Sequence, residues 1–185
     1  MDIILASASP RRQELLHLIF ADFRCIPADI EEIVPDGMEA TCVPEYLACQ
    51  KALHVSKQYP DALVIGSDTA VICGDEIFGK PVDDADAERM IRALSGKAHY
   101  VITGCCIFCN GKSLSFSEKT AVEFYALTDD EIKAYVATGE PKDKAGAYGI
   151  QGEGSLLVKG INGDFFNVVG LPVSRLNREL KKFTV

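Results

Sequence analysis

MDIILASASPRRQELL, residues 1–16, sets an apolar segment directly before a hydroxyl-rich turn and the start of a helix. The run 2–6 has the length and apolar character of a buried strand. Ser9 is a residue type that caps helices, and Pro10 suits the first helical position because its missing N–H needs no partner there. The stretch therefore predicts a strand, a tight turn and a helix that begins at Pro10.

Strand and helix patterns alternate along the rest of the chain, which is typical of a mixed α/β fold. The patterns predict helices at 44–57, 86–94, 129–136 and from Pro172, and strands at 63–73, 100–109, 112–124, 156–158 and 166–169. Asn110 and Gly111 separate two of these strands, as in a type I′ hairpin. The glycine-rich segment 139–154 is expected to be a long ordered loop or a functional one.

Composition narrows the class of protein. The chain has 185 residues, enough for a single domain that can fold as two lobes. No apolar run approaches the ~20 residues of a membrane span, and the short apolar N-terminal run lacks the charge order of a secretory leader, so a cytoplasmic location is expected. A net charge of −8 disfavours binding to nucleic acid. Seven cysteines at irregular spacing predict reduced thiols rather than a disulfide framework.

Two arginines lie in the first turn of the first helix. Arg11 and Arg12 oppose the positive end of the helix dipole there, at about 0.3–1 kcal/mol each. A bound anion would reverse this penalty, because free N–H groups, the hydroxyls of Ser7 and Ser9 and guanidinium groups all suit phosphate. The alternative is that both arginines point into solvent or pair with surface acids. We favour an anion site, which lacks the glycine run and Gly-Lys-Ser/Thr of a Walker A loop.

Asp68 interrupts an apolar strand. A carboxylate among apolar neighbours is costly unless it meets a cation, a hydrogen-bond donor or a metal ion, and Mg²⁺ prefers oxygen ligands. The alternative is a strand end at which an aspartate merely turns the chain. We favour a functional role for Asp68.

Two lysines and one pair of acids are further candidates for a functional site with Asp68. Lys51 lies on the apolar stripe of its helix, where its side chain could also extend to the surface. Lys80 occupies the rigid turn Gly79-Lys80-Pro81. Glu31 and Glu32 could complete a metal site or lie on the solvated surface. In the later segment KAGAYGIQG, 144–152, Gln151 offers a donor and an acceptor suited to a base edge, although by composition this could be any flexible loop.

Taken together, several blocks resemble the Maf-like family nearly from end to end. The blocks, in order, are ASASPRRQELL, EYLACQKA, IGSDTAV, GKP, LSGKAHYVITG, GEPKDKAGAYGIQG and NVVGLPVSRL. The resemblance implies a nucleoside triphosphate pyrophosphatase with a mixed, twisted sheet flanked by helices and two lobes around a deep cleft. This architecture is similar to that of the house-cleaning inosine triphosphate pyrophosphatases.

The resemblance also implies roles for individual residues. Asp68 would accept a proton and, with Glu32, hold a divalent cation, Mg²⁺ or Mn²⁺; which of Glu31 and Glu32 matches the family's acid is left open. The residues implied around the triphosphate are Ser7, Arg12, Lys51 and Lys80. The residues implied in base preference are Arg11, Thr69 and Gln151, and this combination is that of the branch acting on dTTP and UTP.

The expected reaction is attack of water on the α-phosphorus of a pyrimidine nucleoside triphosphate, which releases pyrophosphate. One alternative is the branch that prefers 7-methyl-GTP, but its tryptophan before the second arginine and its Ser-Glu-Gly stretch are missing. Another is a non-catalytic nucleotide sensor linked to septum formation, and the intact Asp68 argues against it. Neither nucleic acid nor membrane is expected as a partner, and a homodimer is expected from the family alone.

Overall fold

The structure is a computed structural model that describes residues 1–183 and separates into two compact units. Unit 1 comprises Met1–Thr69, Thr103–Glu118 and the chain from Gly170 onward. Unit 2 comprises Ala70–Ile102 and Lys119–Val169. Three long strands have residues in both units, and the other elements belong to one unit each.

The described residues form one sheet of seven strands in the order β2-β1-β3-β5-β6-β7, with β4 beside β3. The strands are β1 (Ile3–Leu5), β2 (Arg24–Cys25), β3 (Leu63–Cys73), β4 (Glu76–Phe78), β5 (Ala98–Cys109), β6 (Lys112–Phe124) and β7 (Val158–Asn162). β1 pairs in parallel with β2 and β3, with Ile4 opposite Val64. β4 is antiparallel to β3, and β7 is antiparallel to β6. The expected mixed sheet is confirmed.

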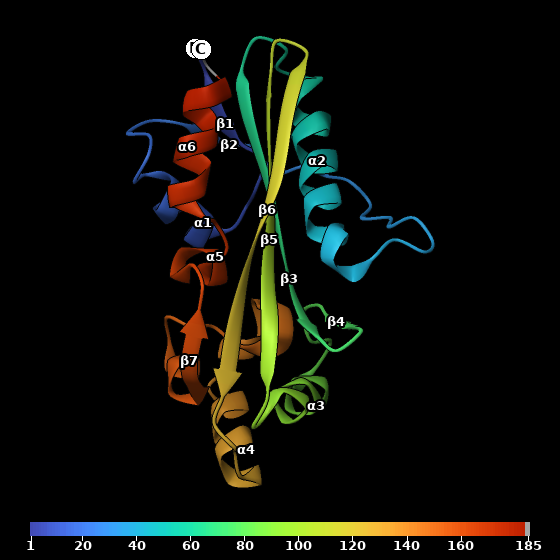
Figure 1. Ribbon diagram of the computed structural model, residues 1–185, viewed down its shortest axis with the longest axis vertical. Helices are drawn as coiled ribbons and strands as arrows, with labels where there is room; N and C mark the ends of the chain where they lie inside the picture. The colour runs from blue at the N-terminus through green and yellow to red at the C-terminus, as the bar shows by residue number, and fades with distance from the viewer. Residues whose placement is uncertain (184–185) are drawn as a thin grey trace. The chain divides into compact units, whose positions relative to one another are not determined.

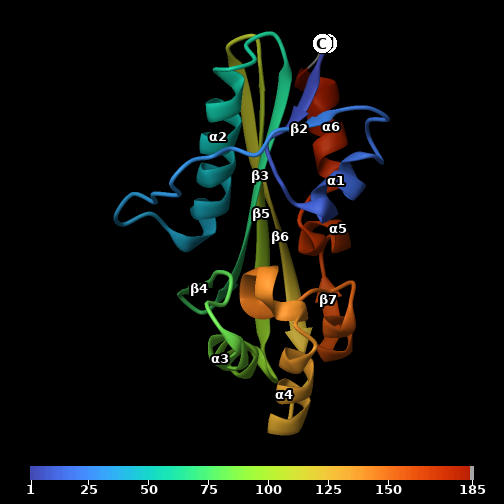
Figure 2. The same ribbon diagram turned by 180° about the vertical axis from the view of Figure 1, so that it is seen from behind.

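Unit 1 has helices on both faces of its part of the sheet. Figures 1 and 2 show α2 (Val43–Ser56) on one face, and α1 (Pro10–Leu16) and α6 (Val173–Phe183) on the other. A short 3₁₀ segment, η1 (Ala40–Cys42), leads into α2. The helix α2 lies very close to the strands, because a Cβ atom at Gly66 would be 2.2 Å from the Ala48 carbonyl oxygen. Glycine is therefore required at this contact.

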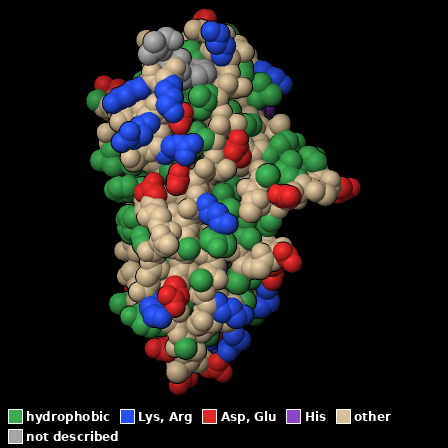
Figure 3. All heavy atoms as spheres, in the orientation of Figure 1, with side chains coloured by type: hydrophobic (Ala, Val, Ile, Leu, Met, Phe, Trp, Pro, Cys, Tyr) green, Lys and Arg blue, Asp and Glu red, His purple; other side chains and the backbone are tan. Residues whose placement is uncertain are grey.

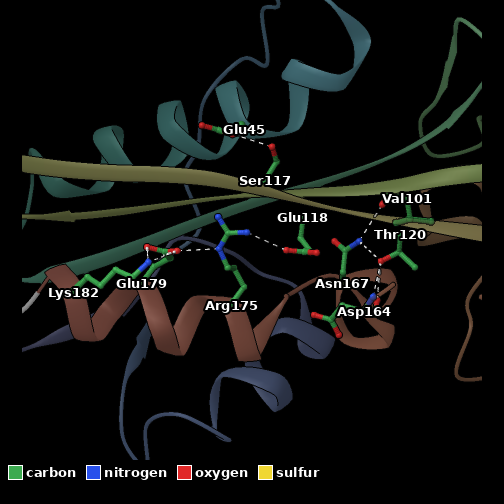
Figure 4. Close-up of polar contacts among 10 residues, drawn as sticks. All are labelled: Glu45, Val101, Ser117, Glu118, Thr120, Asp164, Asn167, Arg175, Glu179 and Lys182. Carbon is green, nitrogen blue, oxygen red and sulfur yellow. Dashed lines mark hydrogen bonds and ion pairs between the residues drawn. The ribbon is translucent and has the colours of Figure 1, made fainter. Parts of the chain in front are cut away.

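The helix α6 is attached to the sheet by charged as well as apolar contacts. Figure 3 shows lysine and arginine side chains gathered over α6, whose sequence VSRLNRELKKF contains four of them. Arg175 donates to Glu179 at 2.9 Å and lies 3.5 Å from Glu118 of β6, while Lys182 also donates to Glu179 (Figure 4). Two of these four basic groups, Arg175 and Lys182, are thus paired with acids.

Unit 2 contains α3 (Asp84–Leu94), α4 (Asp129–Ala137) and α5 (Phe165–Val169). One face of α3 and one face of α4 pack into a common apolar cluster with side chains of the sheet, including Val122 and Phe124. The start of α4 has a capping box, in which Thr128 and Glu131 make both reciprocal hydrogen bonds.

The connections follow the turn chemistry of the sequence. Asn110 and Gly111 have φ values of 50° and 76°, as the predicted hairpin between β5 and β6 requires. The segment 139–154 is ordered as a series of 3₁₀ turns: η2 (Glu140–Asp143), η3 (Ala145–Ala147) and the first residues of η4 (Glu153–Leu157). The described helices include none long and apolar enough to cross a membrane, and all seven cysteines are free thiols.

The prediction of short strands at 156–158 and 166–169 was wrong. The strand here is β7, Val158–Asn162, and the apolar run at 165–169 is the helix α5. The Asp164 carboxylate accepts the backbone N–H of Phe166 at 2.9 Å, which caps the first turn. Figure 4 shows the Asn167 side chain, which donates to the Val101 carbonyl and the Thr120 hydroxyl. Apolar runs of this length do not distinguish strand from helix.

Candidate functional site

Arg12 is folded back over the start of α1 by three hydrogen bonds. Its Nε donates to the Gly170 carbonyl at 2.9 Å, its Nη1 to the Ser7 hydroxyl at 3.3 Å and its Nη2 to the Thr69 hydroxyl at 2.9 Å. The Ser9 hydroxyl accepts the Arg12 backbone N–H at 3.4 Å, as the N-cap of α1. The guanidinium group is therefore fixed in one orientation at a helix N-terminus.

The electrostatics of Arg12 favour an anion nearby. Burial lowers the pKa of Arg12 below its ordinary value, and the negative charge of Asp68 acts in the opposite sense. The adjacent Arg11, half-buried on α1, lowers this pKa further through like charge. An arginine nevertheless stays protonated in a protein. Because the three acceptors are neutral oxygens, they orient this charge without neutralising it.

Lys51 of α2 holds two carboxylates. Its Nζ lies 2.6 Å from Asp68 Oδ1 and 2.7 Å from Glu32 Oε1. The side chains of Lys51 and Asp68 are only 13% and 15% exposed, whereas that of Glu32 is 50% exposed. Lys51 therefore does not extend to the surface, and its charge compensates the acid in the middle of β3. Of the two adjacent acids, Glu32 contacts Lys51, and Glu31 lines a hollow over α2.

The two carboxylates fit the requirements of a magnesium or manganese ion. Oxygens from Asp68 and Glu32, which belong to separate segments, converge on the single cationic nitrogen of Lys51. Mg²⁺ is commonly held by one or two carboxylates together with waters and substrate phosphates. Over residues 1–183 there is no group of three or more His, Cys, Asp and Glu side chains arranged for a metal. The donor set thus suits an ion that shares its coordination with a phosphorylated ligand.

Three residues of this arrangement were missed by reasoning from the sequence: Ser67, Thr103 and Gly170. The Thr103 hydroxyl, fully buried, lies 2.9 Å from the Thr69 hydroxyl, and the Gly170 carbonyl also accepts from Ser67 at 3.4 Å. Gly170 and Thr103 stand in the blocks NVVGLPVSRL and LSGKAHYVITG, so those blocks were the available signal. Neither residue type indicates a role by itself, because one contributes a backbone oxygen and the other a buried hydroxyl.

Unit 2 contains the remaining predicted residues, Lys80 and Gln151, and both are exposed. Lys80 follows β4, and Gln151 lies between η3 and η4. The backbone N–H of Gly146 donates to the Gly79 carbonyl at 3.0 Å, which joins the turn of Lys80 to the glycine-rich loop. A Cβ atom at Gly146 would lie 2.8 Å from Val71 Cγ2, so the loop is packed closely onto β3.

The predicted residues therefore fall into three groups. Hydrogen bonds bring Ser7, Arg12 and Thr69 together, with Arg11 next along α1, and ion pairs bring Glu32, Lys51 and Asp68 together, all within unit 1. Lys80 and Gln151 belong to unit 2. Thr69, which the family resemblance links to base preference, also helps to hold Arg12.

Comparison with known proteins shows the family and the fold. A family model described as "Maf-like protein" matches residues 2–183. Proteins named dTTP/UTP pyrophosphatase in Bacillus cereus (strain AH820) and Bacillus anthracis are each 49% identical over 183 residues, 99% of this chain and 96% of theirs. The Ham1 protein of Staphylococcus aureus shares the fold with a TM-score of 0.59 at 16% identity, over 98% of this chain and 99% of that one.

Proposed function

Because the chain belongs to the Maf-like family, we propose that it hydrolyses dTTP and UTP, each to the nucleoside monophosphate and pyrophosphate. The relatives at 49% identity are named for this activity, and the match covers almost their whole length. The observation that carries the proposal is the ion-paired cluster in which Lys51 joins Asp68 to Glu32.

In the proposed reaction, a water molecule attacks the α-phosphorus. The bond from that phosphorus to the oxygen bridging it to the β-phosphorus breaks, and pyrophosphate leaves with the electron pair. Asp68 accepts the proton of the attacking water, since a carboxylate released from Lys51 is a base on a rigid strand. Lys51 and Arg12 stabilise the negative charge that grows on the leaving group. Reactions of this kind demand mainly positioning and electrostatics from the protein.

We propose that Asp68 and Glu32 hold a divalent cation, Mg²⁺ or Mn²⁺. Such an ion, when bound, neutralises phosphate oxygens and orients the triphosphate. The positive charge of Lys51 between the two carboxylates supports this assignment, because it marks a position where the protein already accommodates a cation. Lys51 would then be free to turn toward the phosphates.

Recognition of the base and of the far phosphates is assigned to the remaining predicted residues. Lys80 would bind the pyrophosphate portion, and Arg11, Thr69 and Gln151 would set the preference for thymine and uracil. The side-chain amide of Gln151 offers both a donor and an acceptor to a pyrimidine edge. A purine would leave such groups unpaired, which is a strong basis for discrimination.

Purified protein incubated with Mg²⁺ or Mn²⁺ and a panel of canonical and modified nucleoside triphosphates tests the proposal. We expect dTTP and UTP to be the best substrates and the products to be monophosphate and pyrophosphate. Asp68→Asn should lower kcat by at least about 100-fold, whereas Asp61→Asn, an exposed aspartate of the same unit, should not change it. Preference for 7-methyl-GTP, or binding without hydrolysis, would refute the assignment.

A further inference from the structure

A single carboxylate accepts hydrogen bonds from the backbone of the loop that carries Gln151. Glu140, the first residue of η2, is partly buried. Its Oε2 accepts the N–H of Glu153 at 2.7 Å, and its Oε1 accepts the N–H of Gly154 at 3.1 Å. Burial by itself would raise the pKa of Glu140, but these two N–H groups, the Tyr135 hydroxyl and the charge of Lys144 together outweigh it, and the net pKa is lowered. Glu140 is therefore held as an anion that orders the chain after Gln151.

The buried Tyr135 of α4 links the same carboxylate to the chain before Gln151. Its hydroxyl donates to Glu140 Oε1 at 3.0 Å and accepts the N–H of Gly149 at 3.2 Å. Three amides, at 149, 153 and 154, thus connect to one carboxylate, directly or through one hydroxyl. They flank Gln151 on both sides.

The glycines of the loop follow from this arrangement. A Cβ atom at Gly152 would lie 2.2 Å from Glu140 Oε2, and one at Gly154 would lie 2.7 Å from the Tyr135 hydroxyl. At Gly149 the clash would be with the Lys144 side chain, at 2.6 Å. The glycines permit close contact with Glu140, Tyr135 and Lys144, so this loop is fixed by its contacts although its composition is that of a flexible one.

The core of unit 2 fixes the segment just before the loop. Tyr148 is buried, and its hydroxyl lies 2.8 Å from His99 Nε2. Its ring packs edge-on against Phe124, with the ring centroids 4.7 Å apart. Tyr148 is thus held in the core, and the amides of 149, 153 and 154 are bonded to Glu140 directly or through Tyr135. Residues 150–152 lie between these fixed points, and Gln151 is the exposed polar side chain among them.

We propose that Glu140 is a positioning residue for base selection: through Tyr135 and the amides of 149, 153 and 154 it presents Gln151 to the nucleobase in one geometry. The inference rests on the proposed function. An amide side chain discriminates between base edges only when its backbone is fixed, because misplacement by about 1 Å removes the advantage of the matching partner.

Two variants of the hydrogen-bonded group test the proposal against a matched control. Glu140→Gln replaces one acceptor oxygen by an NH₂ group, and Tyr135→Phe removes the hydroxyl that joins Glu140 to Gly149. Both should lower the ratio of kcat/KM for dTTP to kcat/KM for dGTP by about tenfold, mainly by raising KM for dTTP. Glu131→Gln makes the same chemical change in the capping box of α4 and should leave the ratio unchanged.

A double-mutant cycle shows whether Glu140 acts through Gln151. In a Gln151→Ala background, Glu140→Gln should leave the dTTP/dGTP ratio unchanged, because the side chain that it positions is gone. A further loss equal to that in the wild-type background would overturn the proposal. If Glu140→Gln is unfolded at the assay temperature, Tyr135→Phe with Gln151→Ala completes the same cycle.

Amide hydrogen exchange separates failure of this inference from failure of the proposed function. The amides of Glu153 and Gly154 should exchange at least about tenfold faster in Glu140→Gln than in Glu131→Gln. Faster exchange with an unchanged dTTP/dGTP ratio would refute base positioning by Glu140, as would unchanged exchange. A wild-type protein that hydrolyses no nucleoside triphosphate would instead refute the proposed function.

Discussion

Arg12 and Lys51 carry the same charge but are held in different ways, and this difference decides which substitutions each position can tolerate. Arg12 directs three separate nitrogens to Gly170, Ser7 and Thr69. Lys51 presents one nitrogen to two carboxylates. A planar group with fixed donor directions is not replaced by an ammonium group, whereas a point charge between two anions can be replaced by another cation.

Arg12→Lys should therefore be a severe change although the charge is kept. A lysine leaves at least one of the three acceptors without its donor, and the cation moves away from the start of α1. We expect kcat/KM for dTTP to fall on the order of 100-fold and the free energy of unfolding to fall by about 1–3 kcal/mol. The control is Arg24→Lys, which alters an exposed ion pair with Asp2 and should change neither value appreciably. Wild-type kinetics in Arg12→Lys would contradict this account of Arg12.

Lys51→Gln tests whether the two acids form a cation site. Without the ammonium group, Asp68 and Glu32 face each other uncompensated, and the metal-free protein should lose about 2 kcal/mol of unfolding free energy. Mg²⁺ or Mn²⁺ should then raise the Tm of Lys51→Gln more than that of the wild type, as measured by differential scanning calorimetry. The double variant Lys51→Gln/Asp68→Asn should lose this response. An equal response in the single and double variants would exclude the two-carboxylate site.

At the scale of elements, the contact between α2 and the sheet determines where Lys51 lies. A Cβ atom at Gly104 would lie 2.3 Å from Glu45 Cα, and one at Gly66 would be as close to the Ala48 carbonyl oxygen. Both contacts are to backbone of α2, which cannot rotate away as a side chain can. The two glycines of β3 and β5 therefore set the distance of the helix from Asp68.

Gly66→Ala should displace α2 and with it Lys51. We expect a loss of about 2–3 kcal/mol in unfolding free energy, together with a lower kcat, both greater than in Gly160→Ala. A Cβ atom at Gly160 meets no atom within 4 Å, so that variant is the control. Denaturant unfolding and steady-state kinetics provide the two values. If Gly66→Ala and Gly160→Ala behave alike, the close packing of α2 is not what positions Lys51.

Elements with local signals were predictable, and those without were not. The hairpin at Asn110-Gly111 and the capping box at Thr128 are encoded by two to four adjacent residues. The helix α5 was predicted as a strand because its five residues, FFNVV, are too few to show a helical period. The two-residue strand β2 follows from pairing with β1 and has no pattern of its own.

The same distinction holds for the site at the scale of the whole molecule. Asp68 and Lys51 could be found because a charged residue in an apolar pattern is costly without a partner. Gly170 could not, since its carbonyl meets Arg12 across 158 positions of sequence and any residue type has a carbonyl. The hydrogen bonds of Glu140 were missed because the segment 139–154, in which they lie, has the composition of a flexible glycine-rich loop.

The stability of the whole chain should depend on pH through His99. Burial lowers the pKa of His99 to about 4, and among the described residues its Nδ1 has no hydrogen-bond partner. In the unfolded chain the pKa is about 6.5. The unfolded state therefore binds more protons between these values, so this group makes folding less favourable as pH falls from about 6.5 to 4, by about 2–3 kcal/mol in all.

His99→Gln should remove that part of the pH dependence. Unfolding free energies measured from pH 7 to pH 4 should fall less steeply in the variant than in the wild type, although the variant starts lower because the contact with Tyr148 is altered. Parallel curves for the two proteins would mean that His99 is not protonated on unfolding in this range.

Hydrolysis of dTTP in water enriched in ¹⁸O tests the central claim most directly. Attack on the α-phosphorus places the isotope in the thymidine monophosphate and leaves the pyrophosphate unlabelled, as mass spectrometry of the two products can establish. The account predicts one labelled oxygen per monophosphate in a single turnover. Label in the pyrophosphate, release of inorganic phosphate in its place, or intact dTTP in the presence of Mg²⁺ and Mn²⁺ would contradict it.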